Sequence, residues 1–120
     1  MASHRLKTYS GESGYVYQYY FLESQPRKRW WSHVGTAFLF HVTSARKQFF
    51  VVEVLVEARA LEAWERAHGR ALAEPEQYAA AKMRLFRAFD ESESPDRIAE
   101  VRVSESNIES LLEPLHLAED

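Results

Sequence analysis

Residues 35–57 read Gly-Thr-Ala-Phe-Leu-Phe-His-Val-Thr-Ser-Ala-Arg-Lys-Gln-Phe-Phe-Val-Val-Glu-Val-Leu-Val-Glu. Two runs rich in valine, phenylalanine and leucine flank the polar segment Ser44–Lys47, whose length is typical of a β-hairpin loop. Branched and aromatic side chains fit the pleated surface of a sheet, so this stretch predicts two antiparallel strands. We expect the first to start at Trp31 or Gly35 and end at Thr43, and the second to span Gln48–Glu57.

The two predicted strands carry apolar side chains on both faces. Because side chains alternate between the faces of a strand, one face of the first strand receives Phe38, Phe40 and Val42, and its other face receives Leu39 and His41. In the second strand one face receives Phe50, Val52, Val54 and Val56, and the opposite face receives Phe49, Val51, Glu53 and Leu55. A sheet with one face in water normally alternates apolar with polar residues. We therefore expect part of each face to be covered.

The segments outside the hairpin complete an α+β fold. Residues 5–10 and Tyr15–Glu23 predict two earlier strands, the second ended by Ser24-Gln25-Pro26, since proline cannot donate to a strand ladder. After Ala58 the apolar spacing becomes helical. It predicts one helix that stops at Gly69 and another that runs from Pro75 to about Phe89. A strand over Ile98–Val103 and a helix over Ile108–Leu112 follow.

These elements predict one domain over residues 1–120. Its antiparallel sheet has three to five strands, which come mostly from the N-terminal half. Two helices cover one face of this sheet, and a short C-terminal strand and helix complete the fold. Strands that precede the helices argue against parallel winding of the β-α-β type. The expected helix contacts with the sheet are Leu61, Trp64, Leu85, Phe86 and Phe89.

Length and composition limit the class of protein. A chain of 120 residues can bury a core without a metal or disulfide staple. The absence of cysteine excludes disulfides, thiolate metal ligands and a cysteine nucleophile. No run approaches the roughly 18 apolar residues of a membrane span, and the N-terminus lacks the apolar core of a secretory signal. We therefore expect a cytoplasmic protein that does not bind membranes.

Aromatic residues and positive charge are concentrated in the first half of the chain. Twelve of the sixteen aromatic residues lie in residues 1–50, together with seven Lys and Arg residues and two acidic ones. Residues 51–120 carry eight basic and sixteen acidic residues. The sequence thus predicts an aromatic, basic sheet and an acidic helical layer. This asymmetry favours a binding surface over a catalytic site.

The segment Arg27-Lys28-Arg29-Trp30-Trp31 is the strongest candidate for binding a ligand. Proteins that bind single-stranded nucleic acid combine cations, which neutralise phosphates, with flat side chains on which bases stack. A sheet bearing tyrosines beside this segment would suit such a ligand. The candidate binding residues are Tyr15, Tyr17, Tyr19, Arg27, Lys28, Arg29, Trp30 and Trp31. In the competing interpretation, the tryptophans anchor the sheet to the helices and the cations solvate a loop.

The tyrosines of the second predicted strand also suit a dimer interface. Tyrosine buries a large area while its hydroxyl stays hydrated, so it is enriched at interfaces. One thin layer of helices covers only one face of a sheet, so we expect the other face to meet a second copy and form a homodimer. The alternative is that the C-terminal segment folds over this face within one chain.

His41 and Glu53 are the candidate pair for acid–base chemistry. They lie on facing strands and could act as a general base with its orienting carboxylate, or as a polar pair that sets the strand register. The five histidines lack metal-ligand spacing, and neither a nucleophile elbow nor a His-Glu-x-x-His motif occurs. We expect no metal, no cofactor and no catalytic residues. A small-molecule or enzymatic pocket around His41 and Glu53 is the alternative function.

Tyr78 and Lys82 resemble the catalytic Tyr-x-x-x-Lys of the short-chain dehydrogenases over five residues. The chain lacks that family's Gly-rich turn after the first strand and is too short for its dinucleotide-binding domain. Residues four apart meet on any helix, so we expect Tyr78 to pack in the core.

The patterns as a whole predict a non-enzymatic interaction module. It self-associates through its aromatic sheet and binds an anionic or aromatic partner such as single-stranded nucleic acid. A third possibility is a subunit of a larger assembly whose acidic helices face a basic neighbour.

Overall fold

The computed structural model describes residues 5–12, 14, 16–30, 32–44, 49–92 and 98–115. Within these residues the chain forms five strands, three helices and a short 3₁₀ turn. The elements are β1 (Lys7–Ser10), β2 (Val16–Arg29), β3 (Ser32–Ser44), β4 (Phe49–Glu57), α1 (Ala58–His68), α2 (Glu74–Glu91), β5 (Glu100–Val103), α3 (Ile108–Leu112) and the 3₁₀ turn Glu113–Leu115. The predicted α+β class is confirmed.

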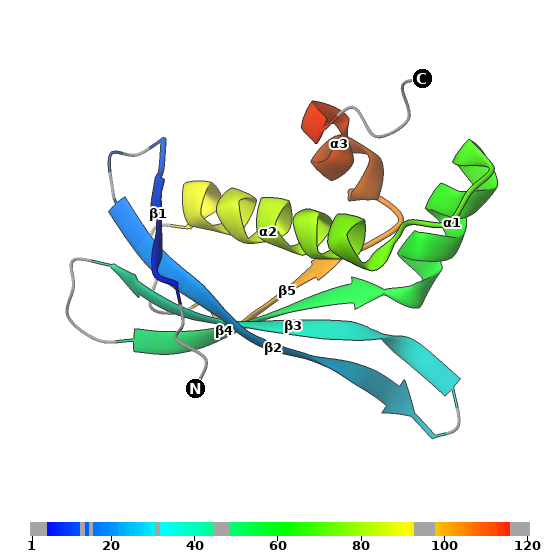
Figure 1. Cartoon of the computed structure of the whole chain (residues 1–120), viewed down its shortest axis with the longest axis horizontal. Coiled ribbons are helices and arrows are strands. Elements are labelled where there is room, and N and C mark those ends of the chain that lie inside the picture. The colour runs from blue at the N-terminus through cyan, green and yellow to red at the C-terminus, as the bar shows by residue number, and fades with distance from the viewer. Residues whose placement is uncertain are drawn as a thin grey trace.

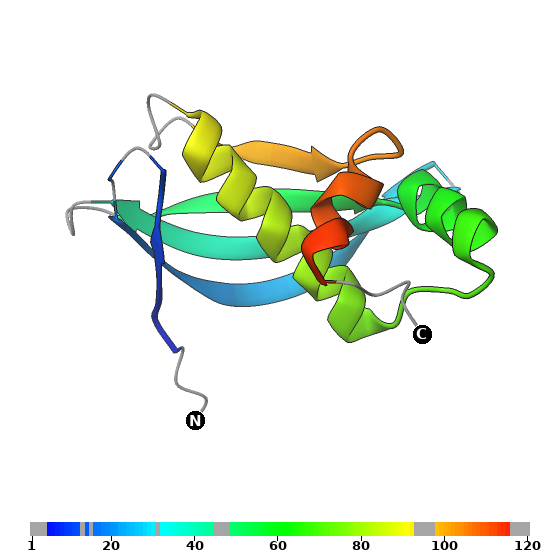
Figure 2. The same ribbon diagram turned by 90° about the horizontal axis from the view of Figure 1, so that it is seen from above.

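The strands form one sheet in the order β1-β2-β3-β4-β5. Figure 1 shows the helices on one side of this curved sheet, and Figure 2 shows α2 running obliquely over the strands. The side toward the helices is called the inner face here, and the opposite side the outer face. Neighbouring strands are antiparallel except β4 and β5, which are parallel. This parallel pair was not expected, and it forms because α1 and α2 bridge the two strands as a long crossover.

The β3–β4 hairpin has the two faces that its sequence predicts. Phe40 pairs with Val52, and His41 pairs with Val51. The inner face carries the fully or almost fully buried side chains Phe38, Phe40, Val42, Val52, Val54 and Val56. The connecting residues 45–48, which include most of the predicted loop, lie outside the described residues.

Helices α1 and α2 cover the inner face with the side chains predicted for this role. Trp64, Leu85 and Phe89 are at most 1% exposed. Leu61 and Phe86 pack against the same core, and α3 adds Ile108, Leu111 and Leu112. Removing this apolar surface from water is the main force that holds the helices on the sheet.

Strand β2 continues six residues past its predicted end at Glu23. β1 pairs with β2 only as far as Tyr19, so β2 is the edge of the sheet from there to Arg29, within the described part of the chain. An edge strand tolerates proline, because one side of its backbone has no ladder to complete. Pro26 therefore stays within the strand, opposite Thr36, instead of ending it.

The connection from β2 to β3 contains only two residues. Arg29 at the end of β2 pairs with Ser32 at the start of β3, and Trp30 between them has a φ of 62°. Two-residue hairpin loops need such positive φ angles and usually carry Asn-Gly or Asp-Gly. The Trp-Trp pair has no such signature, so the sequence did not predict this hairpin.

The predicted end of α1 and the predicted start of α2 are confirmed. α1 is followed by Gly69, whose φ of 76° is left-handed and whose N–H donates to the carbonyl of Glu65. Glycine adopts this conformation without strain and so ends helices. α2 begins at Glu74 with Pro75 in its first turn and extends two residues past the predicted Phe89.

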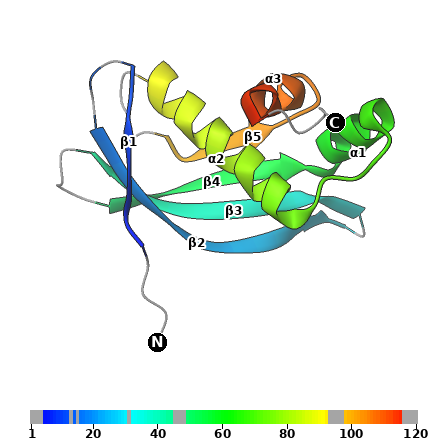
Figure 3. The ribbon, with the colours of Figure 1, turned by 45° about the horizontal axis from the view of Figure 1, so that its top comes forward.

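The C-terminal elements also follow the prediction. β5 falls within the predicted strand Ile98–Val103, and α3 has the predicted bounds. Figure 3 shows β5 at the edge of the sheet opposite β1, with α3 above that edge. In the part of the chain that the structure describes, no helix combines the length and apolar character needed to cross a membrane.

Candidate functional site

Two of the tyrosines predicted to form a binding surface lie in the core. Tyr17 and Tyr19 are 0% and 3% exposed. The ring of Tyr17 stacks on Phe89 with centroids 4.2 Å apart, and its hydroxyl donates to the Phe89 carbonyl oxygen. Tyr19 packs edge-on against Phe86, and burial raises its pKa. Both face α2, so neither can stack on a ligand at the surface. Tyr15 lies outside the described residues.

The predicted basic segment is at the surface, but its members have different environments. Arg27 lies on the outer face, where it forms an ion pair with Glu53 at 2.7 Å and donates to Gln25 at 2.7 Å. Lys28 and Arg29 are exposed, and Trp30 is 82% exposed at the hairpin turn. We call Lys28, Arg29 and Trp30 the basic tip. Trp31 lies outside the described residues.

His41 and Glu53 share the outer face but have separate partners. The hydroxyl of Tyr20 is hydrogen-bonded to Nδ1 of His41, and Glu53 is paired with Arg27. Within the described residues His41 and Glu53 are not bonded to each other. The arrangement predicted for a general base and its orienting carboxylate is therefore absent from this part of the structure.

One half of the outer face exposes apolar and aromatic side chains. Val16, Phe49 and Val51 are each 47–49% exposed. The rings of Tyr20, His41 and Phe49 contact one another with centroids 5.1–5.9 Å apart, and His41 pairs with Val51 across the ladder. We call this surface the outer patch and define it as Val16, Tyr20, Leu39, His41, Phe49 and Val51.

In the other half of the outer face, the apolar residues lie beside the chain's own long polar side chains. Ala37 and Leu55 occupy outer-face positions, yet they are 0% and 4% exposed. The strand register places Gln25 beside Ala37, and Arg102 beside Leu55. Long polar side chains of this kind cover apolar surface with their stems. The apolar residues here are therefore already shielded, unlike those of the outer patch.

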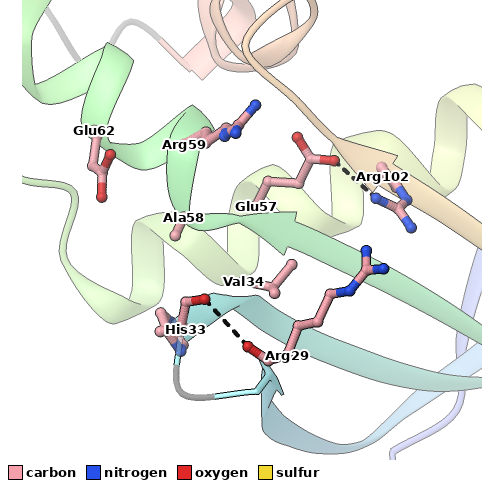
Figure 4. A pocket seen from close by; sticks show the side chains of 9 residues that line it. Arg29, His33, Val34, Glu57, Ala58, Arg59, Glu62 and Arg102 are labelled. Atoms are coloured by element: carbon pink, nitrogen blue, oxygen red, sulfur yellow. Dashed lines mark hydrogen bonds and ion pairs between the residues drawn. The ribbon is translucent and has the colours of Figure 1, made fainter.

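A cleft with a volume of about 460 Å³ lies where the β2–β3 hairpin, the start of α1 and β5 come together. Figure 4 shows Arg59 on one side, Arg29 and Arg102 on the other, and Glu57 between Arg59 and Arg102. Arg102 donates to Glu57 at 3.2 Å. His33 and Glu62 complete the charged and titratable lining. We call this feature the arginine cleft.

A second cleft, of about 410 Å³, lies between β1, the end of α2 and α3. The hydroxyl of Tyr9 donates to Asp90 at 2.6 Å. Burial and this hydrogen bond raise the pKa of Tyr9 to about 12. Tyr9 therefore stays protonated at neutral pH, and its contact with Asp90 ties β1 to α2 without supplying a base or a nucleophile.

Tyr78 packs as the sequence predicts. Its ring contacts Phe21 with centroids 5.1 Å apart, and the ammonium of Lys82 lies over the ring at 5.6 Å. Burial raises the pKa of Tyr78, whereas the tyrosine of a Tyr-x-x-x-Lys catalytic pair needs a lowered one. The five-residue resemblance therefore has no chemical counterpart here.

No family model, characterised protein or solved structure matches this chain. Across the described ranges, no three His, Asp or Glu side chains gather in a way that could hold a metal ion. The surfaces that remain for function are the outer patch, the basic tip and the arginine cleft.

Sequence reasoning identified part of each surface. Alternation grouped Leu39 with His41 in one strand and Phe49 with Val51 in the next, and the strand register brings both pairs to the outer face. Tyr20 belongs to the strand whose tyrosines were predicted to suit a dimer interface, and alternation along this strand was the signal that separates it from Tyr17 and Tyr19. The sequence did not indicate His33, Arg59 and Arg102 of the arginine cleft, which come from three separate elements and share no local pattern.

Proposed function

We propose that this protein is a cytoplasmic, non-enzymatic interaction module that forms a homodimer through the outer patch and engages an anionic partner with its basic tip. The observation that carries the proposal is the contrast within the outer face. Ala37 and Leu55 are shielded there, while Phe49 and Val51 stay half exposed beside the rings of Tyr20 and His41. Contiguous apolar surface of this kind marks interaction sites.

The outer patch can lose its water at low cost. Burying a polar group is expensive unless it is hydrogen-bonded. The hydroxyl of Tyr20 and Nδ1 of His41 already bond to each other, and the patch contains no formally charged side chain. An apolar partner surface can therefore cover it without leaving either of these two polar atoms unsatisfied.

Charge distribution favours a second copy of this chain as the occupant. Residues 51–120 carry sixteen acidic and eight basic residues, and they include all three helices. Two copies that meet at their outer faces hold these acidic helical layers on opposite sides of the dimer. A net charge of only −3 adds little general repulsion. Arg27 and Glu53, which carry opposite charges, border the patch. Opposite charges at its border suit an interface in which the same surface of two copies meets itself.

The basic tip supports the second part of the proposal. Lys28 and Arg29 are exposed beside Trp30, so a ligand can reach both the cations and an aromatic ring. Cations bind phosphates, and aromatic rings stack on bases. Fluorescence anisotropy of a labelled single-stranded oligonucleotide should show binding that weakens as salt concentration rises. Absence of binding at ~50 mM salt would remove this part.

The dimer is tested by replacing an exposed valine with a charge. We expect the wild-type chain to sediment with twice its 14.0 kDa mass and Val51→Glu to sediment as a monomer, because a buried unpaired carboxylate is strongly unfavourable. Leu115→Glu is the matched control, since Leu115 is 37% exposed away from the outer patch. It should remain a dimer. A monomeric wild type, or a Val51→Glu variant that stays dimeric, would refute the proposal.

A further inference from the structure

Within the described residues, two of the three arginines that line the arginine cleft form no ion pair. Arg102 is paired with Glu57 at 3.2 Å and lies 3.7 Å from Glu100. Within the described residues, by contrast, neither Arg29 nor Arg59 forms an ion pair. This holds for Arg59 even though Glu62 lies one turn further along α1. Arg27, which lies two residues before Arg29 in β2, is paired with Glu53.

The cleft is large enough for a small ligand. Its volume of about 460 Å³ lies within the range of roughly 300–1,000 Å³ seen for ligand sites. It exceeds what a bare phosphate would occupy. Val34 and Ala58 line it together with the charged groups, so a ligand with both a charged and an apolar part fits its walls.

The backbone of α1 adds to the positive character of the cleft. The cleft includes Ala58 and Arg59, the first two residues of this helix. Its first turn carries no acidic residue, and no side chain caps it. The partial positive charge of the helix start is therefore not offset by a side chain bonded to it. This effect reinforces the arginines and is secondary to them.

An aromatic residue, Trp30, is the sequence neighbour of the cleft residue Arg29. Trp30 follows Arg29 directly and is 82% exposed. The guanidinium group is a planar fork that binds phosphate oxygens in pairs, and an exposed indole offers a stacking surface to a base. The same short segment thus supplies the two kinds of contact that a nucleotide uses.

We propose that the arginine cleft binds a phosphate monoester attached to an aromatic base, with Arg29 and Arg59 on the phosphate and Trp30 beside the base. A free nucleotide and the 5′-phosphate end of a single strand share this chemistry. The inference sharpens the anionic-partner part of the proposed function, on which it rests, and it does not require the dimer.

The test is titration calorimetry of the full chain with adenosine 5′-monophosphate, inorganic phosphate and adenosine. We expect the nucleotide to bind more tightly than either fragment. The double variant Arg29→Gln, Arg59→Gln should bind it at least about tenfold more weakly, because each charged hydrogen bond contributes that much. Arg66→Gln is the matched control, since Arg66 lies on the same helix in its last turn and outside the cleft. It should bind as the wild type does.

Oligonucleotides with and without a 5′-phosphate distinguish the two sources. Tighter binding of the phosphorylated strand than of the free nucleotide assigns the site to strand ends, and the reverse order assigns it to free nucleotides. Absence of nucleotide binding would show that the arginine cleft is not a nucleotide site. Equal binding of the nucleotide by the double variant and the wild type would show the same. If the double variant binds the nucleotide as the wild type does, while an unphosphorylated strand still binds in a salt-dependent way, the cleft proposal is wrong and the proposed function stands.

Discussion

The inner and outer faces of the sheet come from the same strands and from similar residues, yet their side chains differ in solvent exposure. Val52 is fully buried on the inner face, while its chain neighbour Val51 is 47% exposed on the outer face. Phe40 and Phe49 differ in the same way, at 0% and 49%. The comparison shows that strand hydrophobicity marks the residues that can be buried, whereas the elements packed on the sheet decide which ones are.

The largest expected effect comes from truncating matched rings on the two faces. Phe40→Ala should lower the free energy of unfolding by about 3–5 kcal/mol, because it removes a fully buried ring and leaves a cavity. Phe49→Ala should lower it by about 1 kcal/mol or less, since half of that ring already contacts water. Urea denaturation followed by circular dichroism at low protein concentration measures both. Equal losses of unfolding free energy in the two variants would contradict the difference in burial between the inner and outer faces.

A smaller effect should follow from removing matched tyrosine hydroxyls. Tyr17→Phe should lower the free energy of unfolding by about 1 kcal/mol, because the buried carbonyl of Phe89 loses a donor. Tyr20→Phe should change it by no more than about 0.5 kcal/mol, since water can replace the hydroxyl beside His41. The same denaturation experiment measures both variants. A larger loss for Tyr20→Phe would mean that the outer face is less open than the exposures indicate.

The smallest effect concerns the start of α2, which covers the inner face. Hydrogen bonds from Arg70 and from the N–H of Ala73 lower the pKa of Glu76 to about 2 from its ordinary 4.5. The folded state therefore favours the carboxylate, and its contribution is present above pH 4.5 and is lost as the pH falls toward 2. Glu76→Gln should cost about 0.5–1 kcal/mol at pH 7, since Arg70 is partly exposed and solvent screens the pair.

Denaturation at several pH values checks this linkage. The difference in the free energy of unfolding between wild type and Glu76→Gln should shrink steadily below pH 4.5 and vanish near pH 2. A difference that does not change with pH would mean that Glu76 acts through packing instead of charge. Glu74→Gln is the control, because Glu74 occupies the same first turn and is exposed.

The elements that the sequence predicted well depend on short-range patterns. Alternation assigned the faces of β3 and β4, and Gly69 and Pro75 marked the boundary between α1 and α2. The extent of β2 was missed, because whether Pro26 ends a strand depends on whether a neighbour pairs with it. Its edge position became clear only with the sheet order.

The candidate site was less predictable for the same reason. Tyr17 and Tyr19 were predicted to bind a ligand at the surface, but they lie under a helix whose Phe89 is 72 residues away from Tyr17. The cation cluster was recognised at Arg27–Arg29. The ion pair of Arg27 with Glu53 and the presence of Arg29 and Arg59 in one cleft both depend on strand and helix packing.

The sequence by itself determined which segments form strands and helices and which residues share a face, because backbone preferences, alternation and helix ends act over a few residues. The tertiary structure alone decided which face is covered, which aromatic rings belong to the core and which arginines line one cleft. These outcomes depend on contacts between distant segments, where the burial of apolar surface outweighs local preference.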